Sequence, residues 1–331
     1  MEPDGDASSS TPLRADGLYW QDCGLVLQAE DTVYRLSRDF LASHSPVFRD
    51  MLLIPTPADA ETFDGCPLVR LTDSAKDITR FFNALVRYEC VYFPPHPIPV
   101  SFPVVASVLR MSDKYGVDGL RARALVHLSE VHPTTLADFR ALPPGLTEHL
   151  LIDGLYQARA EVVKLARQLS IDWLLPVAFY RLCQLNPHPH MFTSDITLED
   201  KERWLTGLRL LEGKENNKMI DFLWTPRVID GCTSRSKCSE ERLACRKEAE
   251  GWGIIGHKTG GRQLPLDLWD NGDWARLGVC GNCLATMTAE HATCMQALWD
   301  RLPAIFDLPS WGALEARKAN MMKQCQLHDY E

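Results

Sequence analysis

The stretch DCGLVLQAEDTVYRLSRDFLASHSPVFRDML, residues 22–52, decides the fold of the N-terminal part of the chain. Two short apolar runs, 25–27 and 33–36, flank a polar tetrad, and this pattern predicts a β-hairpin. Ser37 and the pair Ser45–Pro46 are typical helix starts, because a serine hydroxyl accepts hydrogen bonds from free backbone N–H groups and proline suits the first helical position. We therefore predict a hairpin followed by two short helices.

The segments that follow continue this order of strands and then helices. The sequence PLVRLTD, residues 67–73, predicts a returning strand, and Ser74 can cap a helix whose apolar residues recur at spacings of three and four. Further amphipathic patterns predict helices over 104–111 and 120–128, and two more between 155 and 185. This order indicates an α+β domain followed by a mostly helical extension.

Composition narrows the class of protein. A length of 331 residues is typical of about two domains, and 45% hydrophobic with 24% charged residues indicates a globular protein. No apolar run is long enough to cross a bilayer, so no membrane partner is expected. A formal net charge of −9 argues against a broad Lys/Arg surface, and we expect no direct contact with nucleic acid.

The start of the chain and its cysteines indicate a compartment. Residues 1–17 lack the basic and apolar regions of a secretory signal, and their composition predicts a disordered tail. In a chain of this length without a leader, the eleven cysteines are expected to be reduced or bound to a metal. We therefore expect a cytoplasmic protein, a nuclear protein or both.

The N-terminal stretch resembles the BTB/POZ domain. The segments DITRFFNALVRYECVYF (77–93) and VASVLRMSDKYGVDGLRARAL (105–125) are similar to its later helical blocks, and Ser37 stands where many members carry histidine. The proline-rich insertion between these blocks resembles the form of the family expanded in mushroom-forming fungi. The residues that carry the motif are Asp22, Leu36, Leu41, Ser45, Phe48 and Met51.

The resemblance implies a protein–protein interaction protein without enzymatic activity. BTB domains commonly form homodimers and act as scaffolds, transcriptional co-regulators or adaptors of cullin-3 ubiquitin ligases. The cullin-binding signal of the family has no clear match in the loop LIPTPADAETF (53–63), although Glu61 lies in it. The motif residues fit a dimer interface and a monomer core equally well, because packing within one chain uses the same apolar side chains.

The C-terminal part contains the clearest chemical pattern. The sequence CGNC places Cys280 and Cys283 where both thiolates can reach one tetrahedral zinc ion, and Cys238 with Cys245 supplies a second pair. Cys232, Cys238 and Cys245 are spaced too widely for a standard zinc knuckle, and Cys294, His257 and His291 are further candidate ligands. The alternatives are buried reduced cysteines and a thioredoxin-like redox role, but no βαβ unit precedes the motif.

These observations divide the chain into four parts. They are a tail (1–17), a BTB/POZ domain (18–130), a helical extension (131–225) and an irregular Cys- and Trp-rich part (226–331) with a candidate structural zinc. The favoured function is homodimerisation and partner binding with no catalytic residue. The competing function is that of a zinc-dependent regulator or enzyme whose activity lies in the Cys-rich part.

Overall fold

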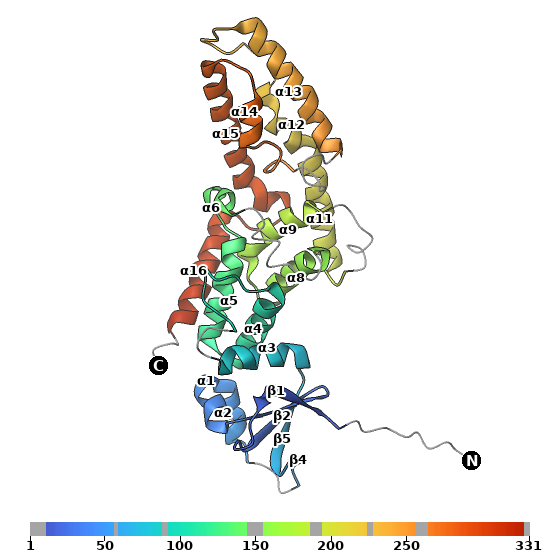
Figure 1. Ribbon diagram of the computed structural model, residues 1–331, viewed down its shortest axis with the longest axis vertical. Coiled ribbons are helices and arrows are strands. Elements are labelled where there is room, and N and C mark those ends of the chain that lie inside the picture. The colour runs from blue at the N-terminus through green and yellow to red at the C-terminus, as the bar shows by residue number, and fades with distance from the viewer. Residues whose placement is uncertain are drawn as a thin grey trace, which may run out of the picture. The chain divides into compact units, whose positions relative to one another are not determined.

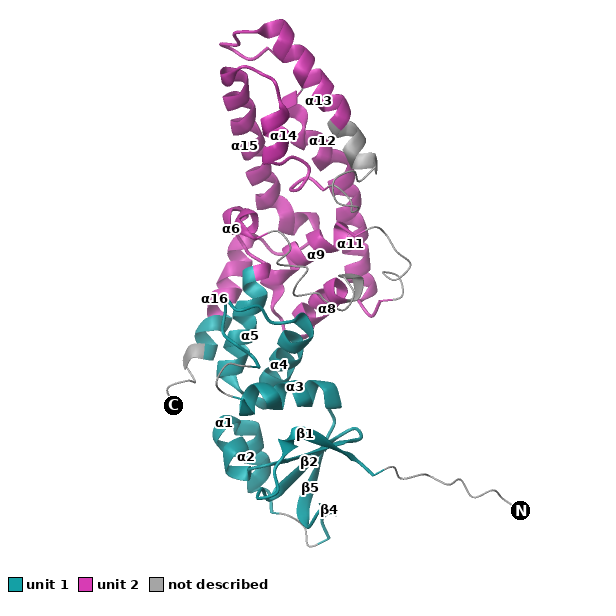
Figure 2. Ribbon diagram, in the orientation of Figure 1, with its two compact units in different colours: residues 1–130, 321–331 teal, residues 131–320 magenta. Residues whose placement is uncertain are grey.

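The computed structural model of the chain describes residues 11–55, 59–87, 92–143, 155–185, 194–223, 228–255 and 264–327 (Figure 1). These residues form two compact units (Figure 2). Unit 1 comprises residues 1–130 and 321–331, and unit 2 comprises residues 131–320. Unit 2 thus includes segments from both sides of residue 225, where the composition of the sequence changes.

A mixed five-stranded sheet begins unit 1 (Figure 1). Its strands lie in the order β1-β3-β2-β5-β4, and the predicted hairpin is confirmed as the antiparallel pair β2 and β3. Strand β1 runs parallel to β3, and β5 runs parallel to β2. The bounds are β1 Leu13–Tyr19, β2 Leu25–Ala29, β3 Thr32–Leu36, β4 Thr62–Phe63 and β5 Cys66–Leu71.

The first strand, β1, corrects the prediction that residues 1–17 form a disordered tail. Residues 13–17, placed in a disordered segment by their composition, belong to β1, and Ala15 and Leu18 of this strand are buried. The physical reason is pairing with β3, since a polar edge strand is stabilised by its backbone hydrogen bonds and needs few apolar residues. Amino-acid composition alone does not predict such a strand.

Helices of unit 1 begin at the expected serines. Ser37 accepts a hydrogen bond from the Phe40 N–H (3.3 Å), and Ser74 accepts one from the Asp77 N–H (3.1 Å). Ser45 caps its helix in the same way and also donates to the Tyr115 carbonyl at 2.5 Å. The helices are α1 Arg38–His44, α2 Pro46–Leu53, α3 Ala75–Val86, α4 Phe102–Tyr115 and α5 Asp118–Val131.

Aromatic side chains join these helices to the sheet. Phe48 of α2 stacks on Tyr115 of α4, with ring centroids 4.5 Å apart, and lies 6.2 Å from Phe82 of α3. Phe82 packs edge-on against Tyr34 of β3, whose hydroxyl bonds to the Ala75 carbonyl at 2.9 Å. These contacts join the sheet to helices α2, α3 and α4 in the core of unit 1.

Unit 2 is built from helices, so the prediction of an irregular C-terminal part is wrong. Residues 235–255 and 281–305 form long helices that contain several of the glycines and cysteines of this part, so the density of these residues did not indicate irregular structure. Among the described residues, no helix combines the length and hydropathy that a bilayer span requires. Helices and single turns have these bounds: α6 Leu136–Ala141, α8 Leu155–Gln168, η1 Asp172–Leu174, α9 Leu175–Cys183, α11 Leu198–Leu210, η2 Leu211–Glu215, α12 Asn216–Met219, η3 Asp221–Leu223, α13 Arg235–Ile255, α14 Asn271–Arg276, α15 Gly281–Ile305 and α16 Trp311–Leu327.

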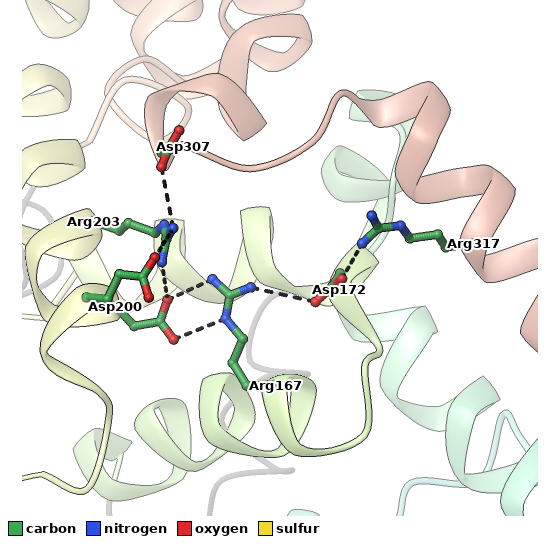
Figure 3. A network of polar contacts seen from close by, with 7 residues as sticks. Arg167, Asp172, Asp200, Arg203, Asp307 and Arg317 are labelled. Atoms are coloured by element: carbon green, nitrogen blue, oxygen red, sulfur yellow. Dashed lines mark hydrogen bonds and ion pairs between the residues drawn. The ribbon is translucent and has the colours of Figure 1, made fainter.

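A chain of ion pairs connects several of these helices (Figure 3). The buried Asp200 carboxylate on α11 accepts two hydrogen bonds from Arg167 of α8, at 2.7 and 3.1 Å, and lies 3.3 Å from Arg203. Arg167 also lies 3.7 Å from Asp172, which accepts a hydrogen bond from Arg317 of α16. Because Asp200 is nearly inaccessible to solvent, its pairing with two arginines is required for its burial.

Candidate functional site

Four cysteines of unit 2 converge. The Sγ atoms of Cys232, Cys238, Cys280 and Cys283 all lie within 4.8 Å of one another. Cys238 and Cys283 are buried, and the other two are half-buried. We call these four residues the cysteine cluster.

Three members of the cluster lie at the N-terminal ends of helices. Cys238 lies in the first turn of α13, Cys280 is the N-cap residue of α15, and Cys283 lies in the first turn of α15. The Cys280 N–H donates to the Cys238 Sγ at 3.2 Å, which ties the two helix starts together. Helix N-termini favour negative charge, so both helices stabilise thiolates at this place.

Cys232 reaches the cluster from the turn before α13. Gly231 adopts a φ of +72°, which L side chains rarely adopt, and its carbonyl accepts a hydrogen bond from the Asn282 amide at 2.7 Å. A Cβ at Gly231 would lie 2.8 Å from that amide nitrogen. A glycine is therefore needed to hold the Cys232 turn against the first turn of α15.

The expected ligand Cys245 is not in the cluster, and Cys232 takes its place. Cys245 lies seven residues after Cys238 on the same helix, which is about 10 Å along the axis at 1.5 Å per residue. Its half-buried thiol has a pKa raised by burial and by Glu248 and Glu241. The signal for Cys232 was its place in the turn sequence DGCTS, because a loop can fold back where a helix cannot.

Hydrogen bonds and burial act differently on these thiols. The pKa of Cys280 is lowered to about 5 by the N–H groups of Cys283 and Thr233. Burial raises the pKa of Cys238 and of Cys283. Four thiolates at these separations would repel one another strongly, so a bound cation is the group that allows all four to be deprotonated.

The sulfur positions suit a tetrahedral metal ion. A zinc–sulfur distance of about 2.3 Å places neighbouring sulfurs of a tetrahedron about 3.8 Å apart. The Sγ atoms of Cys232 and Cys280 lie 3.9 Å apart. The cluster could therefore hold one metal ion with four sulfur ligands and no open coordination position.

The other candidate ligands lie apart from this group. Cys294 is a half-buried residue of α15 outside the cluster, and His257 falls outside the described residues. His291 of α15 is 5% exposed and packs between the rings of Phe222 and Trp274, with centroids 5.4 and 5.6 Å away. It belongs to the aromatic core of unit 2.

The burial of His291 predicts a pH dependence of stability. Its pKa is lowered from 6.5 to about 4, first by burial and then by Arg140, so its stabilising effect is complete above pH 6.5 and is lost as the pH falls towards 4. Between pH 7.5 and 5, we expect the wild type to lose about 2 kcal/mol more unfolding free energy than His291→Phe. Urea denaturation at both pH values measures this difference, and an equal loss in the two proteins would contradict it.

The BTB-type motif residues occupy two kinds of position in unit 1. Leu36, Leu41 and Phe48 are fully buried, so they are core residues of the unit. Ser45 is buried and caps α2, as its hydrogen bonds show. Asp22 is exposed before β2, and Met51 of α2 is half-buried.

Unit 1 also has a cleft of about 880 Å³, which the sequence did not indicate. It lies between the α1–α2 junction and the α4–α5 turn, and its lining includes His44, Arg49, Asp118 and Arg123. The hydrogen bond from Ser45 to the Tyr115 carbonyl fixes these two walls relative to each other.

Comparison with known proteins found no relative of this chain. No family model matches the chain, and neither a curated protein nor a solved structure was found to match it.

Proposed function

We propose that the chain is a non-enzymatic protein–protein interaction protein, with unit 1 a BTB/POZ module that self-associates. In this role it serves as a scaffold, a transcriptional co-regulator or a cullin-3 adaptor. The observation that carries the proposal is the group of large apolar side chains exposed on unit 1.

These side chains lie at the end of α2 and on the edge of the sheet. Leu53 is 76% exposed and Ile54 is 69% exposed, directly after the turn of α2 that carries Met51. Leu13, on the edge strand β1, is 67% exposed, and one side of that strand has no neighbour among the strands that the structure describes. Burial of such surface stabilises association by about 25 cal/mol per Å², which favours a second protein surface over water.

We further propose that the cysteine cluster holds a structural zinc ion. Four thiolate ligands are typical of structural zinc sites, whereas catalytic zinc keeps a position open for water or substrate. The donor set of the cluster leaves no such position. This supports the non-enzymatic function over the competing zinc enzyme.

Light scattering of the full-length chain tests self-association. We expect a dimer whose mass is constant over a wide concentration range, and we expect Leu53→Asp with Ile54→Asp to weaken it by about thirtyfold or more, because a desolvated charge opposes burial. Leu198→Asp is the matched control, since Leu198 of unit 2 is 73% exposed as well. A strict monomer at all concentrations, or equal weakening by the control, would contradict the proposal.

A further inference from the structure

Two members of the cysteine cluster differ from the other two in their exposure. Cys232 and Cys280 are half-buried, whereas Cys238 and Cys283 are only 2% and 1% exposed. An oxidant that arrives from solvent therefore reaches Cys232 and Cys280 first, because oxidation of a cysteine sulfur requires access to it. This accessible pair connects the turn before α13 with the N-cap of α15.

Hydrogen bonds on both sides of Cys232 hold this pair together. The Gly231 carbonyl accepts a hydrogen bond from the Asn282 amide at 2.7 Å. On the other side of Cys232, the Thr233 N–H donates a hydrogen bond to the Cys280 Sγ. Cys232 lies between these two anchored residues, and its Sγ is 3.9 Å from that of Cys280. The turn thus presents one sulfur directly to the other.

The movement that a disulfide requires is easiest for Cys232. An S–S bond is about 2 Å long, so the sulfurs of Cys232 and Cys280 must approach each other by about 2 Å. Cys232 precedes α13 in a turn, whereas Cys238 and Cys283 lie inside the first turns of helices. A shift of Cys232 therefore leaves the helical hydrogen bonds intact. This favours Cys232 over Cys283, the CxxC neighbour, as the partner of Cys280.

We propose that Cys232 and Cys280 form the site at which a hydroperoxide oxidises the cluster to a disulfide and thereby releases its zinc ion. The release of zinc rests on the structural zinc proposed above, whereas the disulfide depends on the sulfur positions alone. Oxidation removes two of the four ligands, and two sulfurs do not complete the tetrahedral set of a structural zinc site. The cluster then acts as an oxidant-sensitive switch on the fold around α13 and α15.

The oxidation balances with hydrogen peroxide as the oxidant. The Cys280 sulfur attacks a peroxide oxygen, an S–O bond forms, the O–O bond breaks, and the hydroxide that leaves takes up a proton to become water. The Cys232 sulfur then attacks the Cys280 sulfur, the S–S bond forms, the S–O bond breaks, and a second hydroxide becomes water. Two thiolates thus lose two electrons to one peroxide, and two protons are consumed.

Tandem mass spectrometry of unreduced peptides tests the site, after one equivalent of hydrogen peroxide is added to the full-length, zinc-loaded chain. We expect one disulfide per chain, between Cys232 and Cys280, formed at the rate at which a chromogenic chelator detects free zinc. Dithiothreitol with added zinc is expected to restore the starting protein. A disulfide between Cys280 and Cys283, or no disulfide within the cluster, would overturn the proposal.

Two matched variants test whether the turn positions the pair. Asn282→Ala keeps all four cysteines but removes the hydrogen bond that anchors Gly231, and we expect disulfide formation to slow about fivefold, the effect of one lost hydrogen bond. Asn271→Ala replaces another exposed asparagine in the first turn of a helix, α14, and is expected to oxidise at the wild-type rate. Equal rates in the two variants would contradict the positioning by the turn.

The zinc content of the untreated protein separates this proposal from the one on which it rests. A chain that lacks zinc but still forms the disulfide between Cys232 and Cys280 supports the oxidation site and contradicts only the zinc ion. A chain that holds zinc and forms a different disulfide supports the zinc ion and overturns the oxidation site.

Discussion

Loss of zinc is expected to unfold the part of unit 2 that contains the cysteine cluster. Cys280→Ser with Cys283→Ser removes two of the four sulfur ligands, and a chelator removes the ion itself. Structural zinc in small domains contributes about 10–16 kcal/mol of apparent binding free energy, which is comparable to the whole net stability of a typical protein, about 5–15 kcal/mol. We therefore expect zinc content to fall to background and the helices α13 and α15 to become sensitive to protease.

Matched variants separate this effect from the general loss of a thiol. Cys245 and Cys294 are half-buried residues of the same two helices that lie outside the cluster. Cys245→Ser and Cys294→Ser are expected to retain one zinc per chain and wild-type resistance to protease. A double variant of the cluster that keeps the stability of the wild type would show that the four thiols are simply reduced and buried.

Gly207→Ala is expected to destabilise unit 2 by about 3 kcal/mol, in the range known for overpacked cores. The same change in an ordinary helix stabilises by about 1 kcal/mol, because glycine has more freedom to lose on folding. At Gly207, however, a Cβ would lie 2.2 Å from Cε1 of Phe306. That ring is fully buried and stacks on Phe179 with centroids 5.3 Å apart, so it cannot move aside.

Chemical denaturation measures this loss, and two further variants give its cause. Gly312→Ala lies on α16 with no atom within 4 Å of the added Cβ, so it is expected to be neutral or stabilising. Phe306→Leu in the background of Gly207→Ala is expected to recover part of the loss, because the shorter side chain makes room. A Gly207→Ala protein as stable as the wild type would show that α11 and the turn after α15 pack less closely than described.

Local signals in the sequence predicted most of unit 1. The hairpin and the caps at Ser37, Ser45 and Ser74 depend on neighbouring residues, and all four are confirmed. Strand β1 was missed because its stability comes from pairing with β3, a contact that leaves little trace in composition. Membership of the BTB/POZ family stays a prediction.

The cysteine cluster was predicted only in part, because two of its members are brought together by local spacing and the other two by tertiary contacts. The CxxC spacing of Cys280 and Cys283 brings two ligands together through local geometry, whereas the partners depend on how α13 and α15 meet. Cys232 and Cys245 lie almost equally far from Cys238 in sequence, and only the turn at Gly231 favours the first.

Zinc analysis of the purified full-length chain, combined with X-ray absorption at the zinc edge, tests the cysteine cluster most directly. We predict one zinc per chain, surrounded by four sulfur atoms at about 2.3 Å. A chain without zinc, or a zinc ion with nitrogen or oxygen ligands in place of the sulfur of Cys232, would contradict the assignment.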